Sequence, residues 1–241
     1  MRIAIAGTRG IPNDYGGFEQ CAEYLSVIFA AHGHDVTVYN SHDHIFTQDH
    51  YKGVKVKHIF NPEKRIGTAG NFIYDYLCMR DAIRNEANVI LMLGYTTASV
   101  FYPLMDFRST VLVTNMDGLE WKRDKWNSVV KRLALWFEKL AAKHSHFHIS
   151  DNGMIRKYLE DTYQISSECI AYGCDPVQEF GPEPPSELDL RKGGYSLVIA
   201  RLEAENNIHT VIEGFLRAGL DEQLVIVGKV NTRYGRELQA K

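Results

Sequence analysis

The sequence has few cysteines, no long hydrophobic run and little net charge. Its four cysteines (Cys21, Cys78, Cys169 and Cys174) are too few and too irregularly spaced for a disulfide framework or a zinc motif. No apolar run approaches the roughly 18 residues that a membrane span needs. A formal net charge of -3 gives no electrostatic case for binding nucleic acid. We therefore expect a cytoplasmic protein with reduced thiols, no signal peptide and no nucleic-acid partner.

The composition itself is that of an ordinary globular protein, with 45% hydrophobic and 24% charged residues among 241. Short apolar runs alternate with helical patterns, which is typical of βαβ units around a parallel sheet. The runs span 2–7, 35–40, 54–60, 88–94, 110–115, 146–150 and 168–172. Helical periodicity is clearest over 18–29, with Gly33 placed to end that helix, and over about 126–143. The sequence therefore predicts an α/β fold with a parallel sheet.

Proline is concentrated in one place. Four of the seven prolines lie within ten residues, namely Pro176, Pro182, Pro184 and Pro185. Such a segment is a poor helix or central strand, so we predict a linker over 176–193 between a first domain, 1–175, and the start of a second, 194–241. A single βαβ unit after the linker is too small to bury both faces of its sheet, so we expect the chain to stop within the second domain.

A glycine-rich turn, GTRGIPNDYGGFEQ, follows the first strand. Gly16 and Gly17 stand directly before the helix, so exposed backbone N–H groups and the positive helix end form an anion site at the carboxyl edge of the sheet. The spacing is neither a dinucleotide fingerprint nor a P-loop, and strand 35–40 ends in Asn40 rather than an acidic residue. Thr8 and Arg9 would line the same crevice. The alternative is that the glycines only shape a turn.

A second loop, NMDGLEWKRDKW, follows the fifth run. Asp117 leaves the carboxyl end of a strand, where open α/β sheets bind ligands. A carboxylate there is suited to orienting a sugar hydroxyl, with Glu120 close by. A solvated turn capped by Asp117 fits the same residues equally well.

The stretch 120–143 carries a surplus of positive charge. It holds seven basic and three acidic residues, a surplus of four on a chain of net charge -3. With tryptophans interleaved, this pattern predicts weak contact with an anionic membrane surface. The predicted contact residues are Lys122, Arg123 and Lys125, together with Lys64 and Arg65. Alternatively, the helix only packs on the core, through the apolar stripe Trp126, Val129, Val130, Leu133, Trp136, Phe137 and Leu140.

Three histidines, His144, His146 and His148, alternate along the chain as metal ligands on one strand face can. However, His144 fits the preceding helix and no nearby carboxylate completes a site, so we expect no metal.

The two loops resemble known proteins when they are taken with the segments AYGCD, at 171–175, and ARLEAENN, at 200–207. Together they resemble GT-B glycosyltransferases of family 4, and most closely the bacterial branch that includes rhamnosyltransferases of capsule and O-antigen assembly. The resemblance covers nearly the whole chain. It implies two Rossmann-like domains, each with helices on both faces of a parallel sheet. It also implies a nucleotide-sugar donor bound mainly by the second domain and an acceptor bound by the first.

The resemblance also implies roles for individual residues. Gly16 and Gly17 correspond to glycines that approach the donor diphosphate, and Arg201 to the basic residue that neutralises it, so no metal cofactor is needed. Asn206 stands where many members carry a second donor-binding cation, and Asp117 where the family has an acceptor-side residue near the reacting sugar. The paired glutamates that hold the donor would lie beyond residue 241, so this chain alone is expected to be a poor catalyst.

The resemblance therefore predicts a retaining, metal-independent hexosyltransferase of EC class 2.4. It would move a sugar, with rhamnose as a candidate, from a nucleoside diphosphate to a lipid-linked oligosaccharide at the inner face of the plasma membrane. Two alternatives stay open: a nucleotide-sugar epimerase of the same GT-B architecture, and a non-catalytic scaffold that binds a glycan or nucleotide. The MDGLEW loop and the basic helix argue against the epimerase, which needs no second substrate.

Overall fold

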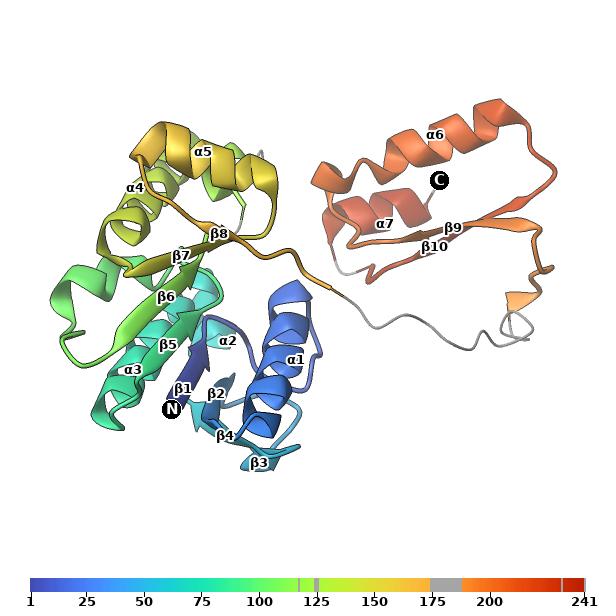
Figure 1. Cartoon of the computed structure of the whole chain (residues 1–241). Helices are drawn as coiled ribbons and strands as arrows, with labels where there is room; N and C mark the ends of the chain where they lie inside the picture. The colour runs from blue at the N-terminus through green and yellow to red at the C-terminus, as the bar shows by residue number, and fades with distance from the viewer. Residues whose placement is uncertain (117, 124–125, 174–187, 231, 241) are drawn as a thin grey trace. The chain divides into compact units, whose positions relative to one another are not determined.

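A computed structural model describes residues 1–116, 118–123, 126–173, 188–230 and 232–240 (Figure 1). The chain divides into two compact units, Met1–Gly173 and Cys174–Lys241. The predicted linker of 176–193 lies largely outside the described residues. In the part of the chain that the structure describes, no helix is long and apolar enough to cross a membrane.

The first unit is built on an eight-stranded sheet of order β3-β4-β2-β1-β5-β6-β7-β8. Every pairing is parallel except that of β3 with β4. The strands are β1 (Arg2–Ala6), β2 (Asp35–Ser41), β3 (His50–Tyr51), β4 (Val54–Ile59), β5 (Val89–Met92), β6 (Val111–Asn115), β7 (Phe147–Ser150) and β8 (Glu168–Cys169). Each predicted apolar run contains a strand, so the predicted α/β parallel sheet is confirmed. The short β3 was not predicted, and β8 is shorter than the predicted 168–172.

Helices connect these strands. They are α1 (Gly17–Ala31), α2 (Glu63–Ile66), α3 (Gly70–Arg84), α4 (Ser128–His144) and α5 (Gly153–Tyr163), with 3-10 turns η1 (Gly67–Ala69), η2 (Ser99–Leu104) and η3 (Glu120–Lys122). The chain leaves α1 through a left-handed Gly33, whose N–H donates to Ala30 O (2.9 Å), while His34 N–H donates to Phe29 O (3.1 Å). This confirms the predicted role of Gly33. Asn127 caps α4 through its side chain, so that helix begins two residues later than predicted.

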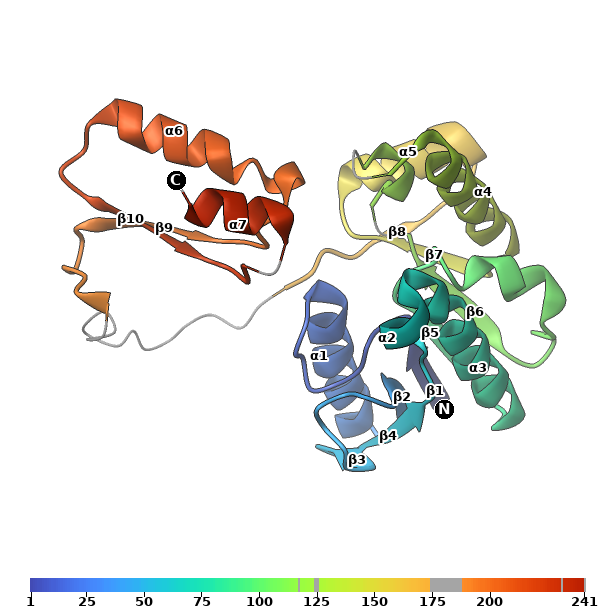
Figure 2. The same ribbon diagram turned by 180° about the vertical axis from the view of Figure 1, so that it is seen from behind.

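Helices cover both faces of this sheet (Figures 1 and 2). In β1, Ile3 and Ile5 belong to the cluster that packs against α1. Ala4 and Ala6 belong to the other cluster, which includes buried residues of α3, α4 and α5. The period of two therefore places apolar side chains on both faces, as expected for a parallel sheet that is buried on both sides.

Helix α4 corrects one prediction. Its buried residues are Ala134, Glu138, Ala141 and Ala142, whereas Val129, Leu133 and Trp136 are 66%, 45% and 48% exposed. The apolar stripe is therefore not simply the core face. Helix α4 packs on η2 and η3, and small alanines allow the close approach that larger side chains would prevent.

The second unit is a two-stranded parallel sheet with two helices. It consists of β9 (Tyr195–Ile199), η5 (Ala204–Asn206), α6 (Ile208–Ala218), β10 (Gln223–Val227) and α7 (Arg233–Gln239). Among its described residues, the buried apolar side chains are those of Leu202 and Ile208. This unit thus has the predicted strand–helix–strand pattern with very little core.

Candidate ligand-binding site at the carboxyl edge of the sheet

The carboxyl ends of β1, β5 and β6 adjoin one another, because these strands are neighbours and parallel. The glycine loop follows β1, Gly94 follows β5 closely, and the 118–123 loop comes soon after β6. Open α/β sheets bind ligands at this edge. The two predicted site loops therefore belong to the same edge of the first unit.

Asn40 holds the glycine loop in place. Its Nδ2 donates to Ile11 O (2.7 Å) and its Oδ1 accepts from Ile11 N–H (2.9 Å). Gly10 has a φ of 131°, and a Cβ built there would lie 2.3 Å from Asn40 Cγ. Only glycine fits at this position. The sequence analysis noted Asn40 merely as a non-acidic strand end and missed its role as an anchor.

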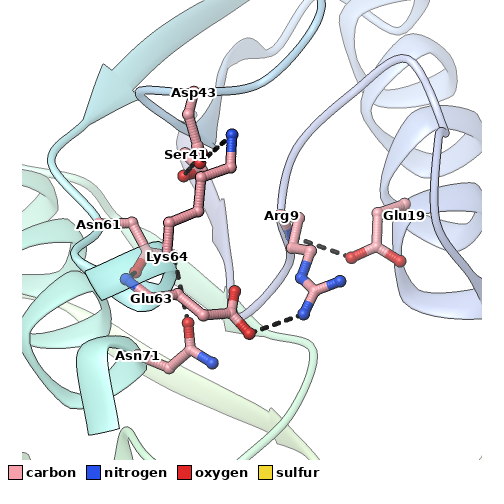
Figure 3. A network of polar contacts seen from close by, with 8 residues as sticks. All are labelled: Arg9, Glu19, Ser41, Asp43, Asn61, Glu63, Lys64 and Asn71. Carbon is pink, nitrogen blue, oxygen red and sulfur yellow. Dashed lines mark hydrogen bonds and ion pairs between the residues drawn. The ribbon is translucent and has the colours of Figure 1, made fainter. Parts of the chain in front are cut away.

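Glu19 holds the same loop from the first turn of α1. Its buried carboxylate accepts a hydrogen bond from the backbone N–H of Arg9 (2.9 Å), as Figure 3 shows. The Arg9 guanidinium donates to Glu63 Oε1 (2.7 Å) and lies 3.6 Å from the centre of the Tyr15 ring. Arg9, predicted to line the crevice, is therefore tied to α2 and to its own loop.

Lys64 also has a partner in this network (Figure 3). Its Nζ lies 2.9 Å from Asp43 Oδ2, and Ser41 Oγ donates to the same carboxylate. Burial opposes ionisation of Asp43, but the hydrogen bonds from Ser41 and Lys64 outweigh it and lower the pKa of Asp43. Lys64 was predicted to contact a membrane; its side chain is 77% exposed and pairs with Asp43, and membrane contact stays a prediction.

Tyr172 lies next to the N-terminus of α1 and forms a hydrogen bond with Asn115 at the end of β6. Gly16 is the N-cap, with extended backbone and no side-chain cap hydrogen bond. A Cβ on Gly17 would lie 3.8 Å from the Tyr172 ring, which is ordinary contact. The Tyr172 hydroxyl accepts a hydrogen bond from Asn115 Nδ2 (2.8 Å). Gly17 therefore lies next to Tyr172, and a Cβ would fit at this position without a clash.

Among the described residues at this edge, the buried Thr8 Oγ1 and Asn115 Oδ1 have no hydrogen-bond partner. Thr8 comes just after β1 and Asn115 ends β6, so they stand on either side of the end of β5. Leaving a buried polar atom unpaired costs about 1–3 kcal/mol, and a ligand with hydroxyl or amide donors would satisfy the Asn115 oxygen. The sequence indicated Thr8 but missed Asn115 and Tyr172, although Asn115 stands two residues before Asp117.

The 118–123 loop uses Glu120 for its own structure. The Glu120 carboxylate accepts from Arg123 Nη1 (2.8 Å) and from Trp126 Nε1 (3.3 Å). Glu120 was predicted to contact the acceptor, and Arg123 was predicted to contact a membrane. In the structure these two side chains form an ion pair with each other. Lys122 Nζ lies 5.2 Å from the centre of the Trp121 ring. Asp117 and Lys125 lie outside the described residues.

The second unit carries basic residues at the carboxyl edge of its own sheet. The parallel register pairs Ile199 with Val227, so Arg201 and Lys229 each follow two residues after that pair. The Arg201 side chain is exposed and lies 4.0 Å from Glu205 Oε1. Asn206, predicted to bind the donor, donates through Nδ2 to Arg201 O (2.7 Å) and so braces this turn. Lys229 was missed, although its position after β10 matches that of Arg201 after β9.

The alternating histidines have separate environments. His144 ends α4, as predicted. His146 Nδ1 accepts from Leu112 N–H (3.0 Å), and His148 Nε2 lies 3.1 Å from Ala142 O. Within the described residues, no group of three or more histidine, cysteine, aspartate or glutamate side chains is arranged to hold a metal ion.

The fold is of the α/β GT-B type, and solved structures of low sequence identity share it. Sucrose-phosphate synthase from Thermosynechococcus elongatus aligns with a TM-score of 0.69 at 14% identity, over 99% of this chain and 65% of the synthase. UDP-N-acetylglucosamine 2-epimerase from Rickettsia bellii aligns with a TM-score of 0.53 at 13% identity, over 98% of this chain and 66% of the epimerase. A putative enzyme of the same name from Listeria monocytogenes aligns with a TM-score of 0.56 at 13% identity, over 99% and 65%.

The chain thus spans about two thirds of the length of these structures. Residues 1–175 match the family described as a domain of unknown function, DUF1972, and the chain belongs to this family. No curated protein sequence matches it.

Proposed function

We propose that the protein is a glycosyltransferase of the GT-B type that transfers a sugar from a nucleoside diphosphate to an acceptor hydroxyl. The observation that carries this proposal is the unpartnered Asn115 Oδ1, buried at the carboxyl edge beside the uncapped N-terminus of α1. An oxygen acceptor suits a sugar hydroxyl, and helix N–H groups suit a phosphate. The fold shared with sucrose-phosphate synthase supports the class of reaction.

In this proposal the backbone N–H groups at Gly16 and Gly17 bind a phosphate. Arg201 and Lys229 would neutralise the charge that develops on the leaving diphosphate, so the reaction would need no metal. Asp117 is proposed to orient the acceptor near the reacting sugar. Retention of configuration, a deoxyhexose such as rhamnose, and a lipid-linked acceptor in surface polysaccharide synthesis are finer proposals that rest on the sequence resemblance.

The experiment is a transfer assay with protein from the complete reading frame, UDP-glucose or dTDP-rhamnose, and a polyprenyl-diphosphate-linked sugar. Asn115→Ala is expected to lower kcat/KM about 10- to 100-fold, because a buried hydrogen bond to the substrate is lost. Tyr172→Phe is the matched control, since it removes the internal hydrogen bond to Asn115 Nδ2 and leaves Asn115 Oδ1 in place, and it should cost less than about threefold. Equal losses in both variants would reduce Asn115 to a structural role.

Arg201 gives a second test. Arg201→Ala should lower the rate about 10²–10³-fold, as loss of one charge-stabilising donor does, and Arg201→Lys should restore only part of it. The exposed Arg217 on α6 provides the control, and Arg217→Ala should leave the rate unchanged. An Arg201→Ala variant as active as the control would contradict the role given to Arg201.

A nucleotide-sugar epimerase is the second candidate, because two of the similar folds are named as such enzymes. It predicts a changed sugar on the nucleotide when UDP-N-acetylglucosamine is incubated without acceptor. Transfer that requires acceptor, with no change in its absence, would exclude this candidate.

We further propose that α4 brings the protein to an anionic membrane, where a lipid-linked acceptor would lie. Exposed Leu133 and Trp136 stand beside exposed Arg132 and Lys139 on this helix, which is the combination that binds anionic interfaces. Sedimentation with vesicles of anionic phosphatidylglycerol should fall as salt rises, and Trp136→Ala should weaken it. Ile28→Ala, at an exposed apolar residue of α1, is the control. Equal sedimentation with neutral vesicles would reject electrostatic docking.

A further inference from the structure

Glu138 is a charged residue in the interior of the first unit. It lies in the middle of α4, is 1% exposed, and has no part in the proposed binding of either substrate. We propose that Glu138 is a positioning residue that fixes the 118–123 loop at the carboxyl edge of the sheet. Its effect on turnover rests on the proposed function, whereas its effect on the loop does not.

Four donors converge on the Glu138 carboxylate. Oε1 accepts from the hydroxyls of Tyr158 and Tyr163, both at 2.6 Å. Oε2 accepts from Trp121 Nε1 (3.2 Å) and lies 3.1 Å from the Tyr95 hydroxyl. A carboxylate offers about four acceptor positions, so these donors fill it. A buried charge is tolerated when it is satisfied to this extent.

The two oxygens serve different parts of the structure. The donors to Oε1 both come from the α5 region, the body of the unit. Oε2 faces the 118–123 loop: Trp121 is part of it, and the Tyr95 hydroxyl shares its one proton between Oε2 and Gly118 O, each 3.1 Å away. One oxygen therefore anchors Glu138 to the body, and the other anchors the loop to Glu138.

The tyrosines of the body remain donors over a wide pH range. Burial, and then the hydrogen bond to Glu138, raise the pKa of Tyr158 and of Tyr163. Each hydroxyl therefore keeps its proton at neutral pH and continues to donate to the carboxylate. Tyr158 and Tyr163 therefore hold the Glu138 carboxylate in place from the body of the unit.

Beyond the Glu138 network, the loop is held by local bonds of Glu120 with Arg123 and Trp126. None of the described residues 118–123 is fully buried. Gly118 has a φ of 39°, a left-handed conformation that turns the chain there. Without Glu138, the indole N–H of Trp121 would lose its hydrogen-bond acceptor, and the loop would lose this hydrogen bond to α4.

The network offers two pairs of variants that each remove one donor to the same carboxylate; the three Tyr→Phe changes remove a hydroxyl alone, whereas Trp121→Phe also shortens a ring that contacts Tyr158. On the loop side these are Trp121→Phe and Tyr95→Phe, and on the body side Tyr158→Phe and Tyr163→Phe. The measurement is amide hydrogen exchange by NMR on the full chain at Lys122 and Arg123, whose N–H groups bond to Leu119 O and Glu120 O. No ligand is needed.

Loop-side variants should speed exchange at these two amides about tenfold or more, while body-side variants should change it less than about twofold. Thermal denaturation of all four variants checks that they remain folded. Equal exchange in the two pairs would overturn the proposal, because Glu138 would then be only one more contact of the core. Unchanged exchange in Trp121→Phe would overturn it as well.

Turnover tests the consequence for the reaction. In the transfer assay with dTDP-rhamnose, Trp121→Phe should raise the KM for the acceptor or lower kcat about tenfold, with the KM for the donor unchanged. Unchanged kinetics together with faster exchange would overturn a positioning role in catalysis. A protein with no transferase activity would overturn the proposed function, while the exchange measurement would still decide whether Glu138 fixes the loop.

Discussion

The two units share a strand–helix–strand pattern and differ in what they bury. Among its described residues, the first unit buries three acidic side chains: Glu138 inside a network of donors, and Glu19 and Asp75 with one hydrogen bond each, from Arg9 N–H and the Thr97 hydroxyl. In the second unit the described apolar side chains stay largely outside: Leu197, Ile199 and Leu216 are 50%, 73% and 72% exposed. An eight-stranded sheet with helices on both faces provides an interior in which donors can be held rigidly around a charge. A two-stranded sheet does not.

This difference decides how each unit positions its candidate site. In the first unit, the buried residues Asn40 and Glu138 form hydrogen bonds with the two loops at the carboxyl edge and so fix them. In the second unit, Arg201 and Lys229 lie on the surface, and the turn that carries Arg201 is braced by hydrogen bonds from Asn206 Nδ2 to Arg201 O and from Thr232 Oγ1 to Leu202 O. Substitution of Asn40 or Glu138 should therefore lower the stability of the first unit, whereas substitution of Arg201 or Lys229 should leave the stability of the second unit unchanged.

The largest expected effect is on amide hydrogen exchange. Amides of β9 and β10 should exchange at least about 10³-fold faster than those of β1 and β5, because few apolar side chains cover them. Exchange followed by mass spectrometry on the full chain measures this ratio. Similar protection in the two sheets would contradict the comparison.

The second expected effect concerns buried charge. Glu138→Leu should lower the free energy of unfolding by about 3–5 kcal/mol, because four donors lose their acceptor. Glu213→Leu, at an exposed position of α6, should change it by less than about 0.5 kcal/mol. Urea denaturation of both variants gives the two values, and comparable losses would remove the distinction between the units.

The third expected effect concerns the backbone at two glycines. Gly10→Ala should cost about 3 kcal/mol, since it combines a φ of 131° with a clash against Asn40. Gly219→Ala, at a φ of 59° with no atom close by, should cost about 1 kcal/mol. Thermal unfolding followed separately for each unit by NMR would check this, and a neutral Gly10→Ala would show that Asn40 moves aside.

The fourth expected effect depends on pH. Burial raises the pKa of Asp75 to about 7 despite a hydrogen bond from Thr97, and the unfolded value is about 4. The folded state therefore keeps a proton that the unfolded state has lost, and the free energy of unfolding falls as pH rises from about 4 through about 7.

Between pH 5 and pH 7 the loss due to Asp75 is expected to be about 2 kcal/mol. Asp75→Asn should remove this slope, because it replaces the protonated acid with a neutral group. Asp221→Asn, at an exposed position of the second unit, should keep it. Denaturation curves at several pH values give the slopes, and an unchanged slope in Asp75→Asn would show that this residue ionises freely.

The smallest expected effect is on the stability of the second unit. Arg201→Ala and Lys229→Ala should each change its free energy of unfolding by less than about 0.5 kcal/mol, because both side chains are exposed. Thermal unfolding of this unit followed by NMR measures the change. A larger loss would mean that these cations support the fold, and any loss of activity in their variants would need another explanation.

The sequence was enough to predict every strand of the large sheet except β3, the helix over 18–29 and the turn at Gly33, because two-residue and 3.6-residue periods and left-handed glycines act over a few positions. It also placed both site loops at strand ends. The face that α4 buries followed from tertiary packing, since close contact with neighbouring segments selected Ala134 and Ala141 over Leu133 and Trp136.

The partners of the site residues were likewise decided only by the tertiary structure. Arg9 pairs with Glu63, 54 residues away, and Glu138 gathers donors from positions 95, 121, 158 and 163. No local pattern encodes these contacts, because each depends on which strand ends the sheet order brings together. The amino-acid type determines what a side chain can bind. The fold determines which partner the side chain meets, and therefore whether it binds a ligand or holds a loop.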